Sequence, residues 1–266
     1  PMLPHKNLLP DVNLTPYSIW LATVVVSGIS YLSYLLKRYV FHESGTLVSG
    51  IIGGLYSSTA TISVLARKSR KASEQESTDY VAAMLLAISM MFLRFMILIL
   101  IFSREIFLSI YPYLLTMAVV AAIVAWFIHS RQKRSNDQPV EAEEDDSSNP
   151  LEFKVALIFA VLFVVFTFLT HYTLVYAGTG GLNLLSFVSG FSDITPFILN
   201  LLQNTGSVAA LIITACSMQA IISNIMVNMF YALFFAGKGS KLRPWILGGF
   251  GVVIACNLVL LLFFYI

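Results

Sequence analysis

The chain has 266 residues, of which 58% are hydrophobic and only 11% are charged, and its formal net charge is +2. An ordinary soluble domain has about 25% charged residues, and several apolar runs here reach the roughly 20 residues that span a bilayer. The composition excludes a soluble globular fold and predicts an all-α polytopic membrane protein.

Residues 1–15 form an N-terminal extension that precedes the first apolar run, 16–37. This run is too long for a cleavable signal peptide, and it is not followed by the small residues of a cleavage site. The opening Pro1 indicates a chain that is cut from a longer one or renumbered. Both cysteines, Cys216 and Cys256, lie in apolar runs, so no disulfide framework is expected.

The second apolar stretch, 45–66, contains most of the segment GGLYSSTATISVLAR (53–67). The glycine pair permits a break, and in hydrocarbon a broken backbone must face protein or water. We expect the following hydroxyls to cap a half-helix whose N-terminus attracts anions or polarised oxygen. The candidate substrate- or ion-binding residues are Gly53, Gly54, Ser57, Ser58, Thr59 and Thr61. The alternative is ordinary packing of helices through small residues.

Arg94 is the only cation deep inside a long apolar run, 80–102. A charge at this depth must pair, reach the interface or face water. Its obvious partner is Asp193, the only carboxylate well inside an apolar stretch. The pair would be either a structural lock or a gate, and direct contact between Arg94 and an anionic substrate is the alternative.

The stretch 180–203 is the second interrupted one, and it contains GFSDITPFILNL (190–201). Because an intramembrane Asp is expensive and by default marks a functional site, Asp193 and Thr195 join the candidate binding residues. Asp193 would bind a cation or carry a proton, or it would simply cap a half-helix that has Pro196 in its first turn.

The run 206–236 carries polar side chains on one helix face. Asn224 and Asn228 are four residues apart, and Ser217 lies about two turns earlier. We expect these three residues to line a cavity; hydrogen bonding between helices is the alternative.

A shift of 136 residues aligns the apolar patterns of the two halves, which indicates an internal duplication. It pairs run 16–37 with 152–173, run 107–130 with 243–266, Gly54 with Gly190, Ser57 with Asp193, and Thr59 with Thr195. The predicted organisation is an N-terminal extension (1–15), a first transmembrane repeat (16–130), a polar acidic linker (131–151) and a second transmembrane repeat (152–266).

The basic residues distinguish two topologies. If 45–66 and 180–203 crossed the membrane, the two faces would hold nine and six Lys and Arg; if both are re-entrant, the faces hold thirteen and two. The larger asymmetry fits the positive-inside rule and puts the linker 131–151 in the cytoplasm. Each repeat then has about three crossing helices and one re-entrant hairpin, and the second repeat is inverted, as in many secondary transporters. Broken helices that span the whole membrane are the alternative.

Three stretches resemble the uncharacterised membrane domain that follows the MgtC/SapB domain in a family of bacterial and archaeal proteins. They are LPDVNLTPYSIWLATVVVSGISYLSY (9–34), GTLVSGIIGGLYSSTATISVLARKSR (45–70) and MFLR (91–94), with a looser match at 190–201. The resemblance implies a location in the plasma (inner) membrane, a link to magnesium homeostasis and an MgtC-like domain as a partner. That family has more acidic and Thr residues after the Asp. Ile194, Pro196 and Phe197 depart from this pattern, which puts a carboxylate-rich cation site in doubt.

The sequence therefore predicts a transporter or ion pathway for a small ion or solute, with a midplane site between two opposed helix breaks. The alternative is a non-transporting regulatory or scaffold membrane protein linked to magnesium homeostasis. No Cys/His pair and no His/Glu metal spacing is found, so we expect neither an enzyme nor a cofactor, and we assign no metal ligand. Expected partners are the lipid bilayer and the transported ion or solute; a homo-oligomer stays open, and nucleic acid is not expected.

Overall fold

The computed structural model describes residues 4, 7, 14–36, 39, 45–70, 77–131, 153–203, 208–237 and 240–265. The helices of this described part are α1 (Pro16–Leu35), α2 (Thr46–Lys68), α3 (Ser77–Phe102), α4 (Arg104–Ser130), α5 (Phe153–Ser189), α6 (Ile194–Gln203), α7 (Ala210–Ala236) and α8 (Arg243–Tyr265), and no strand occurs in it. Apart from Arg131, the predicted linker lies outside the described residues, as does most of the N-terminal extension.

Seven of these eight helices are long and apolar enough to cross a membrane, and α6 is the short exception. Large apolar side chains are widely exposed on the bundle: Trp126 is 68% exposed, Phe263 75% and Tyr176 83%. Such surfaces suit contact with lipid, because hydrocarbon does not penalise them as water does. The predicted class, an all-α polytopic membrane protein, is confirmed.

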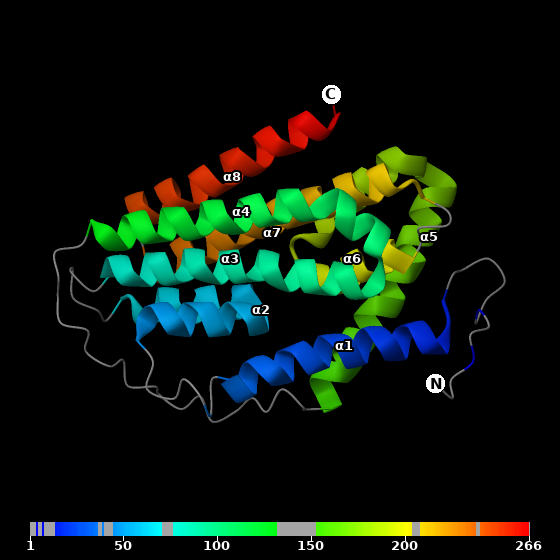
Figure 1. Ribbon diagram of the computed structural model, residues 1–266, viewed down its shortest axis with the longest axis horizontal. Coiled ribbons are helices and arrows are strands. Elements are labelled where there is room, and N and C mark those ends of the chain that lie inside the picture. The colour runs from blue at the N-terminus through cyan, green and yellow to red at the C-terminus, as the bar shows by residue number, and fades with distance from the viewer. Residues whose placement is uncertain are drawn as a thin grey trace.

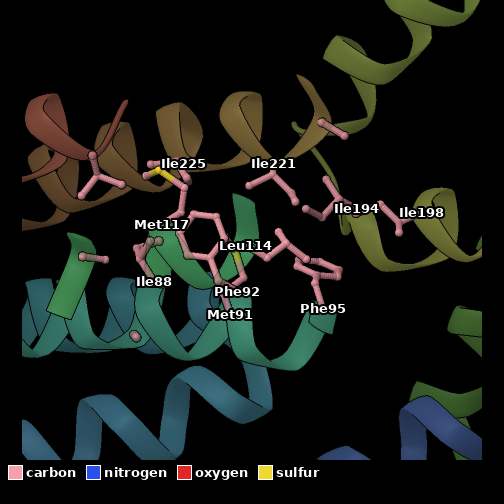
Figure 2. Packing of buried hydrophobic residues seen from close by; sticks show 14 of the residues in the cluster. Ile88, Met91, Phe92, Phe95, Leu114, Met117, Ile194, Ile198, Ile221 and Ile225 are labelled. Carbon is pink, nitrogen blue, oxygen red and sulfur yellow. The ribbon is translucent and has the colours of Figure 1, made fainter. Parts of the chain in front are cut away.

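The core lies where α3, α4, α6 and α7 meet. Figure 2 shows the packing there, with α3 contributing Ile88, Met91, Phe92 and Phe95, α4 contributing Leu114 and Met117, α6 contributing Ile194 and Ile198, and α7 contributing Ile221 and Ile225. Every one of these side chains is at most 2% exposed. Because α6 packs into this core, its first turn is buried.

α2 is a helical hairpin and not one straight helix. Its backbone leaves the helical region at Ser57, where φ is −158° and ψ is 109°. A Cβ atom on Gly53 would lie 2.4 Å from Thr61 Oγ1, although residues eight apart in a straight helix are separated by about 12 Å. The two halves therefore fold back on each other. In Figure 1 both ends of α2 lie at the same end of the bundle. We call residues 46–68 the first hairpin.

A second hairpin follows the bend in α5. Gly178 has φ 59° and ψ −151°, a conformation that glycine adopts at little cost. Residues 179–189 then run back into the bundle, the chain turns at 190–193, and α6 returns toward the end it came from (Figure 1). Residues 179–203 are called the second hairpin.

Helices that the 136-residue shift pairs run in opposite directions. A Cβ atom on Gly249, near the start of α8, would lie 3.2 Å from Ile128, near the end of α4. Farther along α8, Asn257 accepts a hydrogen bond from Tyr113, which lies nearer the start of α4. The colours in Figure 1 show the same opposition between α3 and α7.

One end of the bundle gathers most of the described basic residues. There Arg70 Nη2 donates to Phe234 O at 3.1 Å, and His129 Nδ1 lies 2.7 Å from Asp79 Oδ1. These contacts bring together the end of α2, the start of α3 and the ends of α4 and α7. The described basic residues of the adjoining segments are Arg67, Lys68, Arg70, Arg131, Lys241 and Arg243. Arg104, the first residue of α4, follows the turn that joins α3 to α4 at the opposite end.

Candidate functional site

The tip of the first hairpin is a helix start built by Ser57. Its extended backbone ends the first half-helix, and its Oγ accepts a hydrogen bond from Ala60 N–H at 3.3 Å. This is N-cap geometry, in which a hydroxyl satisfies a free amide of the first turn. The predicted capping of a half-helix by this hydroxyl cluster is confirmed for Ser57. Ser58 beside it is buried, and Thr59 is half-buried.

The tip of the second hairpin is a helix start built by Asp193. Its Oδ1 accepts from Thr195 N–H at 2.9 Å, so Asp193 caps α6. Thr195 and Pro196 are buried in the first turn of α6, whereas the Asp193 side chain is exposed. The N-cap alternative therefore describes how this carboxylate is held, and its binding role stays a prediction.

The two hairpins make the same close contact with their neighbours. A Cβ atom on Gly54 would lie 2.5 Å from Ala87 Cα, and one on Gly190 would lie 2.3 Å from Ser223 Cβ. Gly190 and Ser223 each lie 136 residues after Gly54 and Ala87. A contact that recurs at the predicted shift supports the interpretation of an internal repeat.

Arg94 joins the two tips. Its Nη1 donates to Tyr56 O at 2.8 Å, and its Nη2 donates to Thr195 Oγ1 at 3.1 Å. Tyr56 ends the first half of the first hairpin, where helix carbonyls lack partners within the helix. The guanidinium also lies 5.4 Å from the ring centroid of Phe95. A single charged side chain from α3 thus bonds to both hairpins at their breaks.

The expected pair of Arg94 and Asp193 is indirect. The charged atoms of Arg94 and Asp193 are more than 4.0 Å apart. The ion pair found within that distance among the described residues is His129 with Asp79, at the basic end of the bundle. Asp193 instead accepts from the backbone N–H of Thr195, the residue to whose hydroxyl Arg94 donates. Arg94 Nε is buried and donates to no acceptor.

The three candidate residues of α7 are buried, and one of them, Asn224, holds the second hairpin. Asn224 Nδ2 donates to Gly190 O at 3.2 Å, and Asn228 Nδ2 donates to Asn224 Oδ1 at 3.1 Å. Ser217 Oγ donates to Ile213 O at 2.8 Å within its own helix. For Asn224 the alternative of hydrogen bonding between segments fits these contacts, and a cavity-lining role for the three residues stays a prediction.

The remaining predicted site residues take packing positions. Gly53 and Thr61 contact each other across the first hairpin, and Gly54 lies against α3. The expected break at this glycine pair is wrong: both glycines are helical, and the backbone leaves the helix at Ser57. Sequence reasoning missed two participants. The first is the Tyr56 carbonyl, which has no sequence signature, and the second is Ser223, whose Oγ donates to Phe187 O at 2.7 Å. Ser223 could have been found as the residue that the shift pairs with Ala87.

Ser57→Ala is expected to lower the free energy of unfolding by about 1 kcal/mol, because it removes the N-cap of the second half-helix. Ser57→Asn should retain most of the stability, since Asn caps as well as Ser. Ser63→Ala is the matched control, because its hydroxyl only bonds back to Thr59 O in its own helix. Chemical unfolding in detergent measures all three, and equal losses for Ser57→Ala and Ser63→Ala would contradict the cap.

Comparison with known proteins identifies a family but no established activity. Residues 24–236 match the model described as "Domain of unknown function (DUF4010)". An uncharacterised protein of Aquifex aeolicus (strain VF5) is 25% identical over 224 residues, which covers 83% of this chain and 96% of that protein. No solved structure matches the chain. A match to the MgtC/SapB family is not among these findings, so that link stays an expectation. The chain belongs to the family of the domain of unknown function DUF4010.

Proposed function

We propose that this protein moves a small ion or solute across the membrane through a site between the tips of its two hairpins. The observation that supports this most is the bridge of Arg94 to Tyr56 O and Thr195 Oγ1. In a bilayer, broken backbone and a buried charge are both costly, and both mark functional regions of membrane proteins. Here the two features coincide at one place.

The arrangement suits alternating access. Two helix starts, capped by Ser57 and Asp193, approach the same guanidinium from opposite ends of the bundle. Opposed broken helices of this kind form the binding sites of many secondary transporters, which expose the site to each face in turn. The contact of both tips with Arg94 corresponds to a state in which the pathway is closed between them.

We further propose that the basic end of the bundle faces the cytoplasm of a bacterial-type cell, with the protein in the plasma (inner) membrane. The clustering of Arg67, Lys68, Arg70 and Arg131 at that end supports this orientation through the positive-inside rule. The linker 131–151 follows Arg131 and would then be cytoplasmic as well.

Flux into proteoliposomes tests the proposed transport. Purified protein should move at least one of Na⁺, Mg²⁺, phosphate or a small organic anion above the rate of empty liposomes. Thr195→Val should lower that rate by about tenfold or more, because it removes an acceptor from a charged donor. Thr116→Val is the matched control, since its exposed hydroxyl only bonds Pro112 O within α4.

Two results would argue against transport. One is a wild-type protein that is folded in the vesicles and moves none of these solutes. The other is a Thr195→Val rate that equals the Thr116→Val rate. Absence of flux together with a stable membrane partner would favour a regulatory or scaffold protein.

A further inference from the structure

We propose that the site between the hairpin tips takes a small oxyanion, a carboxylate- or phosphate-like group, and that Arg94 selects its charge. This inference rests on the proposed function, because it names the substrate class of the same site.

The unused donors of Arg94 point to an oxyanion. A guanidinium has five N–H donors, and the bonds to Tyr56 O and Thr195 Oγ1 use two of them. Its Nε is buried without an acceptor, a costly state for a charged group away from water. The Nε–H and a neighbouring Nη proton form a fork that matches two oxygens of a carboxylate or phosphate. An oxyanion therefore supplies the acceptors that the protein leaves out.

The charges around the site nearly cancel. Arg94 contributes +1 and Asp193 contributes −1. The helix N-termini capped by Ser57 and Asp193 each add about +0.5, and the half-helices that end at Tyr56 and Ser189 each add about −0.5. The free donors of Arg94, and not the net charge, therefore favour an oxyanion.

Several groups that would bind a cation are already engaged. The backbone carbonyls at the tips accept from protein donors, with Tyr56 O bonded to Arg94, Gly190 O to Asn224 and Phe187 O to Ser223. The Asp193 carboxylate accepts from its own helix. Within the described ranges no three His, Cys, Asp or Glu residues come together as a metal-binding group. A cation would find a single carboxylate beside a guanidinium.

Two variants distinguish an anion site from a cation site. For the anion site, Arg94→Lys should weaken binding by about tenfold or more, because a lysine ammonium has no planar fork. Asp193→Asn should tighten binding by about threefold or more, because it removes the negative charge while Asn still caps α6. A cation site would instead lose affinity in Asp193→Asn and change little in Arg94→Lys, because Lys keeps the positive charge.

Thermal unfolding of the purified full chain in detergent measures these affinities, since a ligand of the folded state raises Tm. Inorganic phosphate, sulfate and acetate are titrated as sodium salts against NaCl at equal ionic strength, and Na⁺ and Mg²⁺ are titrated as chlorides. The proposal expects saturable stabilisation by at least one oxyanion, weaker in Arg94→Lys and stronger in Asp193→Asn. If Arg94→Lys does not fold, Asp193→Asn alone decides the sign.

The proposal is overturned if none of the three oxyanions stabilises the protein saturably. It is also overturned if Na⁺ or Mg²⁺ stabilises the protein in a way that Asp193→Asn abolishes. In that second case, flux of the same cation in proteoliposomes would leave the proposed transport standing. Absence of flux for every solute would remove the transport proposal instead.

Discussion

Arg94→Ala is expected to abolish solute flux, with a loss of at least about a hundredfold. The change removes the donors to Tyr56 O and Thr195 Oγ1 together. Hydrogen bonds from a charged group contribute about 1.5–3 kcal/mol each, so the loss of two corresponds to a factor of at least a hundred. The measurement is the initial rate of flux per folded protein in proteoliposomes.

Two variants separate the role of Arg94 in the site from a general loss of charge. Arg94→Lys keeps the positive charge but cannot present the same planar pair of donors, so it should recover little of the flux. Arg104→Ala removes an exposed arginine at the far end of α3 and α4 and should transport normally. Wild-type flux in Arg94→Ala would contradict the assignment of Arg94 to the transport site.

Gly54→Ala is expected to destabilise the protein by about 2 kcal/mol or more. The added Cβ would lie 2.5 Å from Ala87 Cα and 2.6 Å from Ala87 O, which are backbone atoms of α3 that cannot rotate away. The first hairpin would have to move off α3, and overpacking of this kind typically costs about 1–3 kcal/mol. Unfolding in detergent measures the loss.

Gly28→Ala and Gly251→Ala are the matched controls, because nothing lies within 4 Å of a Cβ atom at either helical position. Since Ala favours a helix over Gly by about 1 kcal/mol, both controls should be neutral or stabilising. Gly190→Ala tests the equivalent contact of the second hairpin, where the Cβ would meet Ser223 Cβ at 2.3 Å. If Gly54→Ala were as stable as Gly28→Ala, the close packing of hairpin and α3 would be wrong.

The local features of the site were predictable from the sequence. Hydroxyls that follow a glycine pair in an apolar stretch indicate a capped helix start, and Ser57 performs that role. The 136-residue shift placed Asp193 opposite Ser57 in the alignment, and both residues cap a helix. These predictions succeeded because capping depends on residues within one turn of the chain.

The contacts between distant segments were harder to predict. An Arg and an Asp in apolar runs suggested a direct pair, yet Arg94 bonds to a backbone carbonyl and a hydroxyl. Every residue carries a carbonyl, so no sequence pattern marks Tyr56 as the acceptor. Likewise, Asn224 suits a cavity wall and a hydrogen bond between segments equally well, and only the position of Gly190 O separates the two.

The central claim is that two hairpins enter from opposite faces and that their tips meet inside the membrane. Single cysteines test it most directly, in a chain whose Cys216 and Cys256 are replaced by alanine. Gly45 and Arg70 flank the first hairpin, Gly180 lies at the start of the second, and Ala209 lies beyond its end. Labelling from each side of sealed vesicles should place cysteines at positions 45 and 70 on one face and cysteines at positions 180 and 209 on the other. Labelling of Gly45 and Arg70 from opposite faces, or of Gly180 and Ala209 from opposite faces, would contradict the account.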